Sequence, residues 1–382
     1  MGFSQALSGL NAAATNLDVI GNNIANSQTV GFKGSRTQFA DIYASAQAGV
    51  TQAGLGTQVA GILQNFGTGT LENTGRPLDL AISGSGFFRF VQNDQIVYSR
   101  NGQLTLSGDG YLTNAQGARL TGYPAGVSNG GEPVTLQIPA DTMQPRATSQ
   151  IDVTLNLDAR EPSYTNSATV YDSQGNAHDL TMVFTKDDTV DNTWEVELFV
   201  DGATAGTSPL EFDTNGLPVS GMSTLAASVT VGTNVEPLTF DFNINSTQFG
   251  SNSQLGALNQ NGYAAGDLLG IYIDDKGNIT GNYSNLKSQV LGTIALTNFT
   301  NPEGLQPIGD NAWVVTGNSG EPLTGLPGTG QLGSIEGGAL EGSNVDLTRE
   351  LVNLIIAQRF YQSNAQTVKV QDEVMQTTIN MR

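Results

Sequence analysis

Apolar and small residues recur with helical spacing at the start of the chain. From Phe3 to Ile24 the intervals between them alternate between four and three residues. This is the a/d spacing of a helix that packs along a narrow seam against another helix. The seam consists of Phe3, Leu7, Leu10, Ala14, Leu17, Gly21 and Ile24. It stops before the β-branched and glycine residues at 29–31, so the helix is predicted to end near residues 26–27.

The last part of the chain has the same spacing. Ser343, with Asp346 three residues later, is typical of a capped helix N-terminus, and the acid would lie at the positive end of the helix dipole. No Gly or Pro follows, so one long helix is predicted to run to the end of the sequence. Its seam consists of Leu347, Leu351, Leu354, Gln358, Tyr361, Ala365, Val368, Asp372, Met375 and Ile379.

Two interpretations of these helical ends stay open. The helices can pair with each other as one antiparallel hairpin, or they can also pack against helices of other molecules. Gly9 and Gly21 each cost about 1 kcal/mol relative to Ala inside a helix. A single pair with these interruptions buries too little apolar surface to be stable alone. We therefore expect the ends to fold on partners.

Between the ends, apolar residues alternate with polar ones in short runs, which is the pattern of half-buried strands. Examples are residues 78–82, 86–91, 151–155, 194–198 and 238–242. Asn-Gly and Asp-Gly pairs, as at 101–102 and 201–202, are typical of tight hairpins. The predicted fold class is mainly β, of sandwich or barrel type, bracketed by paired helical termini in a coiled-coil-like layer. Residues 317–338 are predicted to form a long loop.

Charge is scarce and unevenly placed. The 382 residues carry 35 acids and 15 bases, a net charge of -20. Residues 1–71 sum to zero and 341–382 to -1, which leaves -19 between them. Phosphate binding needs clustered Lys and Arg, so nucleic acid and anionic lipid are excluded as general partners. The longest aliphatic run, 354–357, is far too short to span a bilayer. The first base is Lys33, so no secretory signal is predicted.

The residues that usually carry catalysis are nearly absent. The chain has no Cys, which excludes disulfides and thiol chemistry, and its only His is His178. The stretch 274–278 is predicted to be a plain turn and not a calcium loop. The pair Asp187 and Asp188 raises the alternative of a glycosidase, although such pairs arise by chance in an acidic segment. A secreted β-rich adhesin is a further alternative. No catalytic residue, metal site or cofactor is predicted.

Both ends resemble the signatures of the bacterial flagellar rod and hook proteins. Residues 10–33 (LNAAATNLDVIGNNIANSQTVGFK) are similar to the N-terminal signature of that family, and residues 344–382 are similar to its C-terminal tail. The internal stretches 73–90, 98–123, 259–268 and 281–313 also resemble it. The terminal signatures are common to rod, hook and junction members. The length and the extra β segment at 148–262 favour the hook members, with the distal rod protein as the alternative.

This resemblance implies a structural protein and not an enzyme. Hook members form the curved tube that acts as a universal joint between rod and filament. The implied partners are further hook subunits in a homopolymer, the distal rod protein, the hook cap protein, the hook-filament junction protein and the flagellar type III export apparatus. Export by that apparatus would place the chain in the extracellular flagellum without a cleavable signal peptide.

The resemblance also implies a division into domains. A terminal helical domain would comprise 1–30 with 343–382, and 31–71 would be a connecting segment. An inner β domain would comprise 72–147 with 263–342, and an outer β domain 148–262. The Gly-, Ser- and Gln-rich stretch 44–56 is expected to act as a hinge, and the outer domain to set the curvature of the polymer.

Two sets of residues carry the expected function. The polymerisation core, around the central channel, is expected to contain Leu7, Leu10, Ala14, Leu17, Ile24, Leu347, Leu351, Leu354, Tyr361, Ala365, Val368 and Met375. The family motif where the first helix gives way to the connecting segment comprises Asn22, Asn23, Asn26, Gly31 and Phe32.

Overall fold

A computed structural model describes residues 2–42, 56–127, 131–139, 141–219, 223–230 and 236–380. The expected hinge at 44–56 lies outside these residues, apart from Gly56. The chain divides into two compact units. The first contains Met1–Pro139, Ile271–Gly281 and Gln289–Arg382, and the second contains Ala140–Gly270 and Asn282–Ser288. The finer division into four parts stays a prediction.

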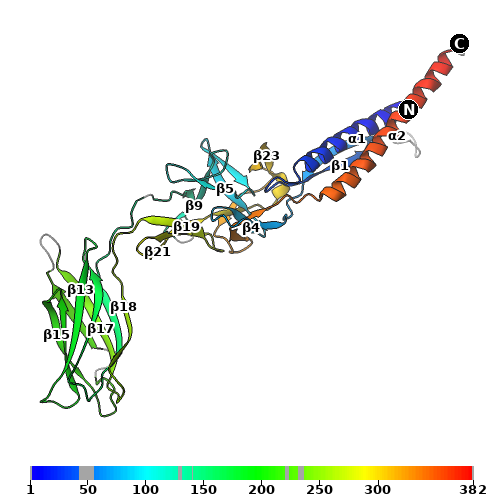
Figure 1. The fold of residues 1–382 in the computed structure, drawn as a ribbon. Helices are drawn as coiled ribbons and strands as arrows, with labels where there is room; N and C mark the ends of the chain where they lie inside the picture. The colour runs from blue at the N-terminus through cyan, green and yellow to red at the C-terminus, as the bar shows by residue number, and fades with distance from the viewer. Residues whose placement is uncertain are drawn as a thin grey trace. The chain divides into compact units, whose positions relative to one another are not determined.

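The predicted helices both form. Helix α1 spans Gly2–Ala25 and helix α2 spans Leu347–Asn380, and the two pack against each other in antiparallel directions (Figure 1). Helix α1 also packs against a hairpin of strands β1 (Ser35–Asp41) and β2 (Thr57–Gln64). The predicted fold class, mainly β with paired helical termini, is confirmed.

The N-terminus of α2 differs from the prediction. The helix begins at Leu347, so Asp346 is the capping residue and Ser343 is not. The Asp346 carboxylate accepts hydrogen bonds from the backbone N–H groups of Thr348 (2.9 Å) and Arg349 (3.2 Å). It satisfies donors that a helix start leaves without intrahelical partners.

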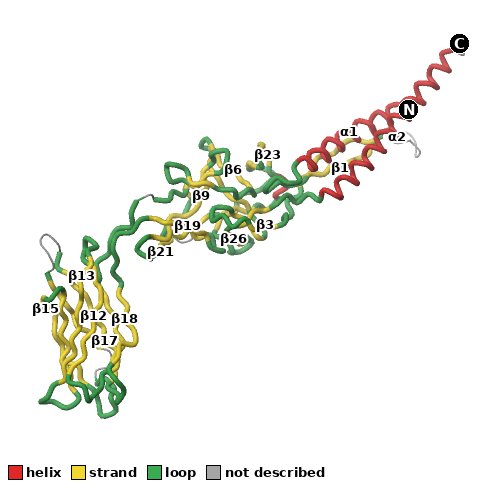
Figure 2. Tube along the Cα trace, viewed as in Figure 1, coloured by secondary structure: helices red, strands yellow, loops and turns green. Residues whose placement is uncertain are grey.

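The β part of the first unit is built from short strands (Figure 2). Strands β21, β9, β5, β6, β24 and β23 are hydrogen-bonded neighbours in that order. An aromatic cluster of Phe87, Tyr98, Phe299 and Trp313, joined by Phe66, forms one of its cores. The strands are β3 (Leu71–Asn73), β4 (Leu80–Ser83), β5 (Phe87–Gln92), β6 (Gln95–Ser99), β7 (Thr105–Leu106), β8 (Leu112–Thr113), β9 (Arg119–Pro124), β10 (Val134–Thr135), β19 (Leu268–Ile273), β20 (Asn278–Tyr283), β21 (Ser288–Ile294), β22 (Leu296–Asn298), β23 (Gln306–Gly309), β24 (Ala312–Val314), β25 (Leu323–Gly325), β26 (Ser334–Gly337) and β27 (Ala339–Glu341), with a 3-10 turn at Pro302–Gly304.

The segment 317–338 is not the long loop that its glycines predicted. It contains β25, which pairs with β22, and β26, which pairs with β4. The glycines lie in turns and close approaches around these short strands. Gly333, for example, has no room for a side chain, because an added Cβ would lie 2.3 Å from the Ser83 carbonyl oxygen.

The second unit is a β-sandwich, as the alternating pattern allowed. One sheet has the order β16-β17-β11-β18 and the other β12-β13-β14-β15. Alternate residues of each strand enter one core, for example Ile151 and Val153 from the first sheet and Trp194 and Val196 from the second. The strands are β11 (Gln150–Asn156), β12 (Ser163–Tyr171), β13 (Ala177–Lys186), β14 (Thr193–Val200), β15 (Ala203–Glu211), β16 (Ser223–Val229), β17 (Leu238–Thr247) and β18 (Gln254–Gln260).

Candidate functional site: the paired helices and their junction with the strands

The face of α1 that packs inward combines small residues with the larger Val19 and Ile20, which are 9% and 5% exposed. Ala6, Ala12 and Ala13 are 5%, 2% and 1% exposed, and Gly9 is also buried. Gly9 lies opposite Asn364, because a Cβ added to it would be 3.0 Å from the Asn364 Oδ1 atom. Small side chains therefore let α1 approach α2 closely along this face.

The predicted seam of α1 lies on a different face. Leu7 is 44% exposed, and Leu10, Ala14, Leu17 and Ile24 are half-buried. The inward residues Ala6, Ala13 and Ile20 each come one position before a residue of the seam. Since one residue corresponds to a rotation of about 100° around a helix, the seam is turned by that angle from the centre of the contact. Phe3 and Leu7, which are 47% and 44% exposed, thus remain accessible in the single chain.

The seam of α2 is partly covered. Half-buried members are Leu354, Tyr361, Ala365 and Val368, whereas Leu347, Leu351 and Met375 are 44%, 44% and 60% exposed. The pairing of the helices within one chain therefore uses only part of the predicted polymerisation core. That core stays a prediction about the contacts between copies.

A second apolar stripe on α2 was missed by the sequence analysis. Val352, Ile356 and Phe360 are 52%, 61% and 51% exposed and follow one another at intervals of four residues. That interval is itself a helical signal. A single alternating seam describes only one stripe of a helix that has two.

The motif residues lie where α1 gives way to β1. The Asn23 side chain is 4% exposed and makes two hydrogen bonds with Ser35: its Nδ2 donates to the Ser35 carbonyl oxygen (2.7 Å), and its Oδ1 accepts from the Ser35 N–H (2.9 Å). Asn26 Nδ2 donates to the carbonyl oxygen of Asn22 (3.0 Å). The turn after α1 is therefore held by amide side chains.

Gly31 and Phe32 continue this junction. Gly31 has a φ of 69°, and an added Cβ would lie 2.7 Å from the Asn101 nitrogen, so a larger residue does not fit. The Gly31 N–H donates to the Glu341 carbonyl oxygen (2.7 Å), and the Phe32 carbonyl oxygen accepts from the Asn344 N–H (3.4 Å). The motif thus brings the segment after α1 against the segment before α2.

A buried group of three charges occupies the same junction. Lys33 Nζ lies 2.7 Å from Glu341 Oε1, and Arg100 Nη1 lies 3.2 Å from Glu341 Oε2. The side chains of Lys33 and Glu341 are 0% exposed and that of Arg100 is 3% exposed. Lys33 also donates to the Gly67 carbonyl oxygen and Arg100 to that of Gly84. We call Lys33, Arg100 and Glu341 the junction triad.

The electrostatics of the junction triad follow from its burial. Burial lowers the pKa of Lys33, and the Glu341 carboxylate opposes this shift. Burial likewise lowers the pKa of Arg100, again against the effect of Glu341. Glu341 also accepts a hydrogen bond from the Gly69 N–H at 2.8 Å. The carboxylate therefore ties together the segments that connect the helices to the strands. Sequence analysis did not identify this group.

The candidate chemical groups of the strands form local hydrogen bonds. His178 Nδ1 lies 2.6 Å from Asp201 Oδ2, and its Nε2 lies 3.3 Å from Asp172 Oδ2. The predicted turn at 274–278 is confirmed, because the Asp274 carboxylate accepts the N–H groups of Lys276 and Asn278. Among the described residues, no group of three His, Cys, Asp or Glu side chains could hold a metal ion.

Asp187 behaves like Asp274. It accepts hydrogen bonds from the Thr189 N–H and hydroxyl within a turn.

In the described part of the chain, no helix has the length and apolar character needed to cross a membrane.

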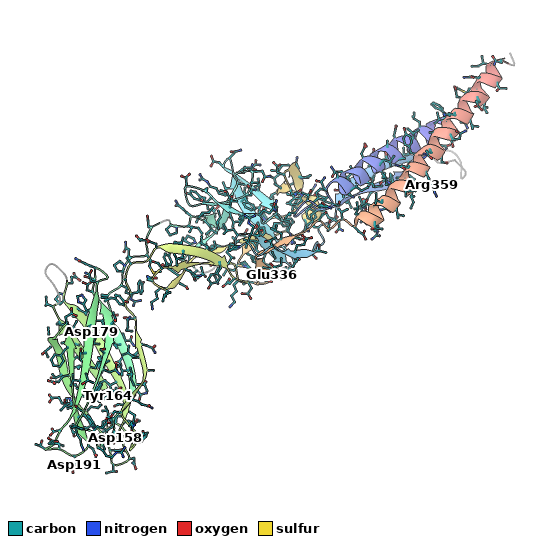
Figure 3. The ribbon with its side chains drawn as sticks, viewed as in Figure 1. Asp158, Tyr164, Asp179, Asp191, Glu336 and Arg359 are labelled. Carbon is teal, nitrogen blue, oxygen red and sulfur yellow. The ribbon has the colours of Figure 1, made fainter. Side chains whose placement is uncertain are left out.

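The second unit has the larger excess of acids over bases. Its segments carry 17 acids and 4 bases, and Figure 3 labels Asp158, Asp179 and Asp191 on the sandwich. The helices of the first unit are almost neutral. The helical pair is thus nearly neutral in net charge, whereas the sandwich is acidic.

Family models match four parts of the chain. Residues 4–33 match the flagella basal body rod protein model and 336–381 the flagellar basal body rod FlgEFG protein C-terminal model. Residues 81–155 match the flagellar hook protein FlgE/F/G D1 domain, and 138–263 match the flagellar basal body protein FlaE D2 domain. The fold and its helical junction are thus those of the axial proteins of the bacterial flagellum.

Relatives that match this chain over its full length narrow the class of flagellar proteins to which it belongs. The chain is 47% identical to the flagellar hook protein FlgE of Escherichia coli and 47% identical to that of Salmonella typhimurium, with 100% of each chain covered. It is 32% identical to that of Borreliella burgdorferi, with 98% of each chain covered. The chain therefore belongs to the flagellar hook protein FlgE family, and these relatives favour a hook protein over a rod protein.

A solved structure has a similar fold. The crystal structure of Helicobacter pylori flagellar hook protein FlgE2 superposes with a TM-score of 0.55, covering 72% of this chain and 99% of that chain at 14% identity. At that identity the likeness concerns the fold alone.

Proposed function

We propose that this chain is the structural subunit of the bacterial flagellar hook. It polymerises through its helical ends into a curved, flexible tube that transmits torque from rod to filament as a universal joint. The support comes from family membership together with the surface of the helical pair.

One observation carries the proposal. Helix α1 buries small residues together with Val19 and Ile20, whereas large apolar residues of the two helices such as Leu7 and Leu351 are 44% exposed. Extended apolar stripes on a soluble chain mark sites of protein contact. Copies of the same chain that meet in a head-to-tail manner, without closing into a ring, produce an open helical assembly.

The distribution of charge supports the same arrangement. In a polymer every charge recurs with every subunit, so charges close to the axis would repel one another repeatedly. The helical ends are nearly neutral, whereas the sandwich has 17 acids and 4 bases. Neutral helices suit the inner layer of a tube, and the acidic sandwich suits its solvated outside.

The partners of the assembled hook belong to the same proposal. The distal rod protein lies below the hook, and the junction protein lies above it. The hook cap protein covers the growing end. The flagellar type III export apparatus delivers the chain without a cleavable signal peptide to the flagellum outside the cell.

Polymerisation of the purified chain tests the proposal. The wild-type protein should form curved tubes visible by electron microscopy at raised salt or under crowding. Leu351→Asp should stay monomeric, because the charge would enter an apolar helix contact. Leu217→Asp is the matched control, because Leu217 is 47% exposed in the sandwich and lies outside the helical seams. Straight tubes from the wild-type protein would favour a distal rod protein, and normal tubes from Leu351→Asp would refute the helical core.

A further inference from the structure

A groove runs along the helical pair beside the β1–β2 hairpin. It has a volume of about 530 Å³ and lies between α1, α2 and β1. Its floor is buried and contains the small residues Ala12, Ala13 and Ala357, which are 2%, 1% and 4% exposed, beside the larger Val19 and Ile20, which are 9% and 5% exposed. The described residues therefore leave the space above this floor unfilled, and another molecule can enter it.

The walls of the groove are large and apolar. Phe39 of β1 is 49% exposed, and Ile356 and Phe360 of α2 are 61% and 51% exposed. A buried apolar floor between exposed aromatic and aliphatic walls is the form that receives the apolar face of a helix. The two charged side chains that line it are Arg36 and Glu350, of opposite sign. Such a groove suits a helix that has an exposed apolar face.

The chain itself carries a helical segment of this kind. Since α1 and α2 are antiparallel and Gly9 lies opposite Asn364, the first residue of α1, Gly2, falls opposite residue 371. Residues 372–380 of α2, which we call the overhang, extend beyond it, as Figure 1 shows. In the overhang, Met375 and Ile379 are 60% and 72% exposed and share one face at an interval of four residues.

The lengths of the groove and of the overhang agree. The groove follows α1 from Ala12 to Ile20, which is about 12 Å of helix. The overhang from Asp372 to Asn380 is also about 12 Å long. We propose that the overhang of one copy occupies the groove of a second copy, with Met375 and Ile379 between the walls.

This inference rests on the proposed function and defines one of its contacts. The groove is centred near Ala357 and the overhang near Gln376, so the two copies would be staggered by about 28 Å along the helix axis. Groove and overhang are different surfaces, so the contact is heterologous and can be repeated from copy to copy without closing. Arg36 at the groove is available to the acids Asp372 and Glu373 of the incoming overhang.

Disulfide cross-linking tests the contact directly. The chain has no Cys, so a Phe360→Cys/Ile379→Cys variant contains only the introduced thiols. Within one chain these positions are about 28 Å apart along α2, whereas a disulfide requires Cα atoms within about 7 Å. Mild oxidation under polymerising conditions should therefore give a ladder of covalent multimers on a denaturing, non-reducing gel.

Control variants define the outcomes. Val352→Cys/Ile379→Cys should give no ladder, because Val352 is 52% exposed like Phe360 but does not line the groove. A ladder from this control equal to that of the test variant would overturn the proposal. A third variant, Phe3→Cys/Phe360→Cys, tests a different occupant of the groove, the α1 seam of the second copy. If this variant gives a ladder and Phe360→Cys/Ile379→Cys does not, the proposal is overturned.

A mixing experiment tests the direction of the contact. Phe360→Cys alone and Ile379→Cys alone should remain monomeric on the denaturing gel, whereas an equimolar mixture should form covalent heterodimers. Homodimers of either variant would indicate a two-fold contact and overturn the proposal. A polymer seen by microscopy without the expected cross-link would refute the groove contact alone, whereas the absence of any polymer would refute the proposed function.

Discussion

Lys33 and Glu341 are 308 residues apart in the sequence, yet their side chains form an ion pair of 2.7 Å from which solvent is fully excluded. Lys33 follows α1 and Glu341 precedes α2. Together with Arg100 they hold the helical pair to the strands of the first unit. A buried charge group of this kind is strongly destabilising when one partner is removed, because the remaining charges keep their burial and lose their counter-charge.

Glu341→Gln should therefore destabilise the first unit. We expect a loss of about 3–5 kcal/mol, because Lys33 and Arg100 would remain buried without a carboxylate. Guanidinium unfolding followed by circular dichroism and Trp fluorescence measures the change. Glu336→Gln is the control, because Glu336 is exposed on β26 (Figure 3). Equal stability of the two variants would show that the junction triad does not hold the unit together.

Removing the sandwich should separate assembly from curvature. Thr148 and Gly262 are adjacent, because a Cβ added to Gly262 would lie 2.8 Å from the Thr148 nitrogen. Residues 148–262 can thus be replaced by a short Gly linker that preserves the pairing of Arg146 with Tyr263. We expect the shortened chain to form straight tubes, visible by electron microscopy. Curved tubes would contradict a role of the sandwich in setting curvature.

The stability of the sandwich should depend on pH through His178. Burial lowers the pKa of His178, but its hydrogen bonds to Asp201 and Asp172 outweigh this and raise the pKa above its ordinary value of 6.5. Protonated His178 therefore stabilises the folded sandwich. This stabilisation is fully present below pH 6.5 and is lost as the pH rises through the higher pKa that His178 has in the folded state.

The aspartates give the opposite slope at lower pH. Hydrogen bonds from His178 and the Asp179 N–H lower the pKa of Asp201, so its contribution is lost as the pH falls through that lowered pKa. The melting temperature of the wild-type sandwich should decrease as the pH rises above 6.5, and this decrease should be smaller in His178→Gln. An unchanged pH profile in this variant would contradict the assignment.

Two glycines of α1 should respond differently to alanine. Gly21 is exposed, and an added Cβ meets nothing within 4 Å, so Gly21→Ala should stabilise the helical pair by about 0.5–1 kcal/mol. Gly9→Ala should gain less or lose stability, because the added Cβ would lie 3.0 Å from Asn364 Oδ1. Thermal unfolding of the assembled protein, followed at the helical circular dichroism band, measures both. A larger gain from Gly9→Ala would mean that the helices are not packed closely at this point.

The sequence predicted the elements more completely than their contacts. The alternation of Ile151, Val153 and Leu155 marks one buried face, and burial on one face is what a sandwich requires. The helices follow from spacing alone. Small residues such as Gly9, Ala12 and Ala13 indicated that the first helix allows close approach on more than one face, but the hydrophobic spacing did not indicate which face packs inward. The junction triad was not predicted, because periodicity has no information about a pair as distant as Lys33 and Glu341.

The placement of the two tryptophans has a practical consequence. Trp194 lies in the core of the sandwich and Trp313 in the aromatic cluster of the first unit, and the chain has no other Trp. The Trp313 indole N–H donates to Gln64 Oε1 at 2.7 Å, whereas the Trp194 indole N–H is buried without a hydrogen-bond partner in the described chain. Each unit thus contains its own intrinsic fluorophore in a distinct polar environment. Phe substitutions at either position would allow the unfolding of the two units to be timed separately in unlabelled protein.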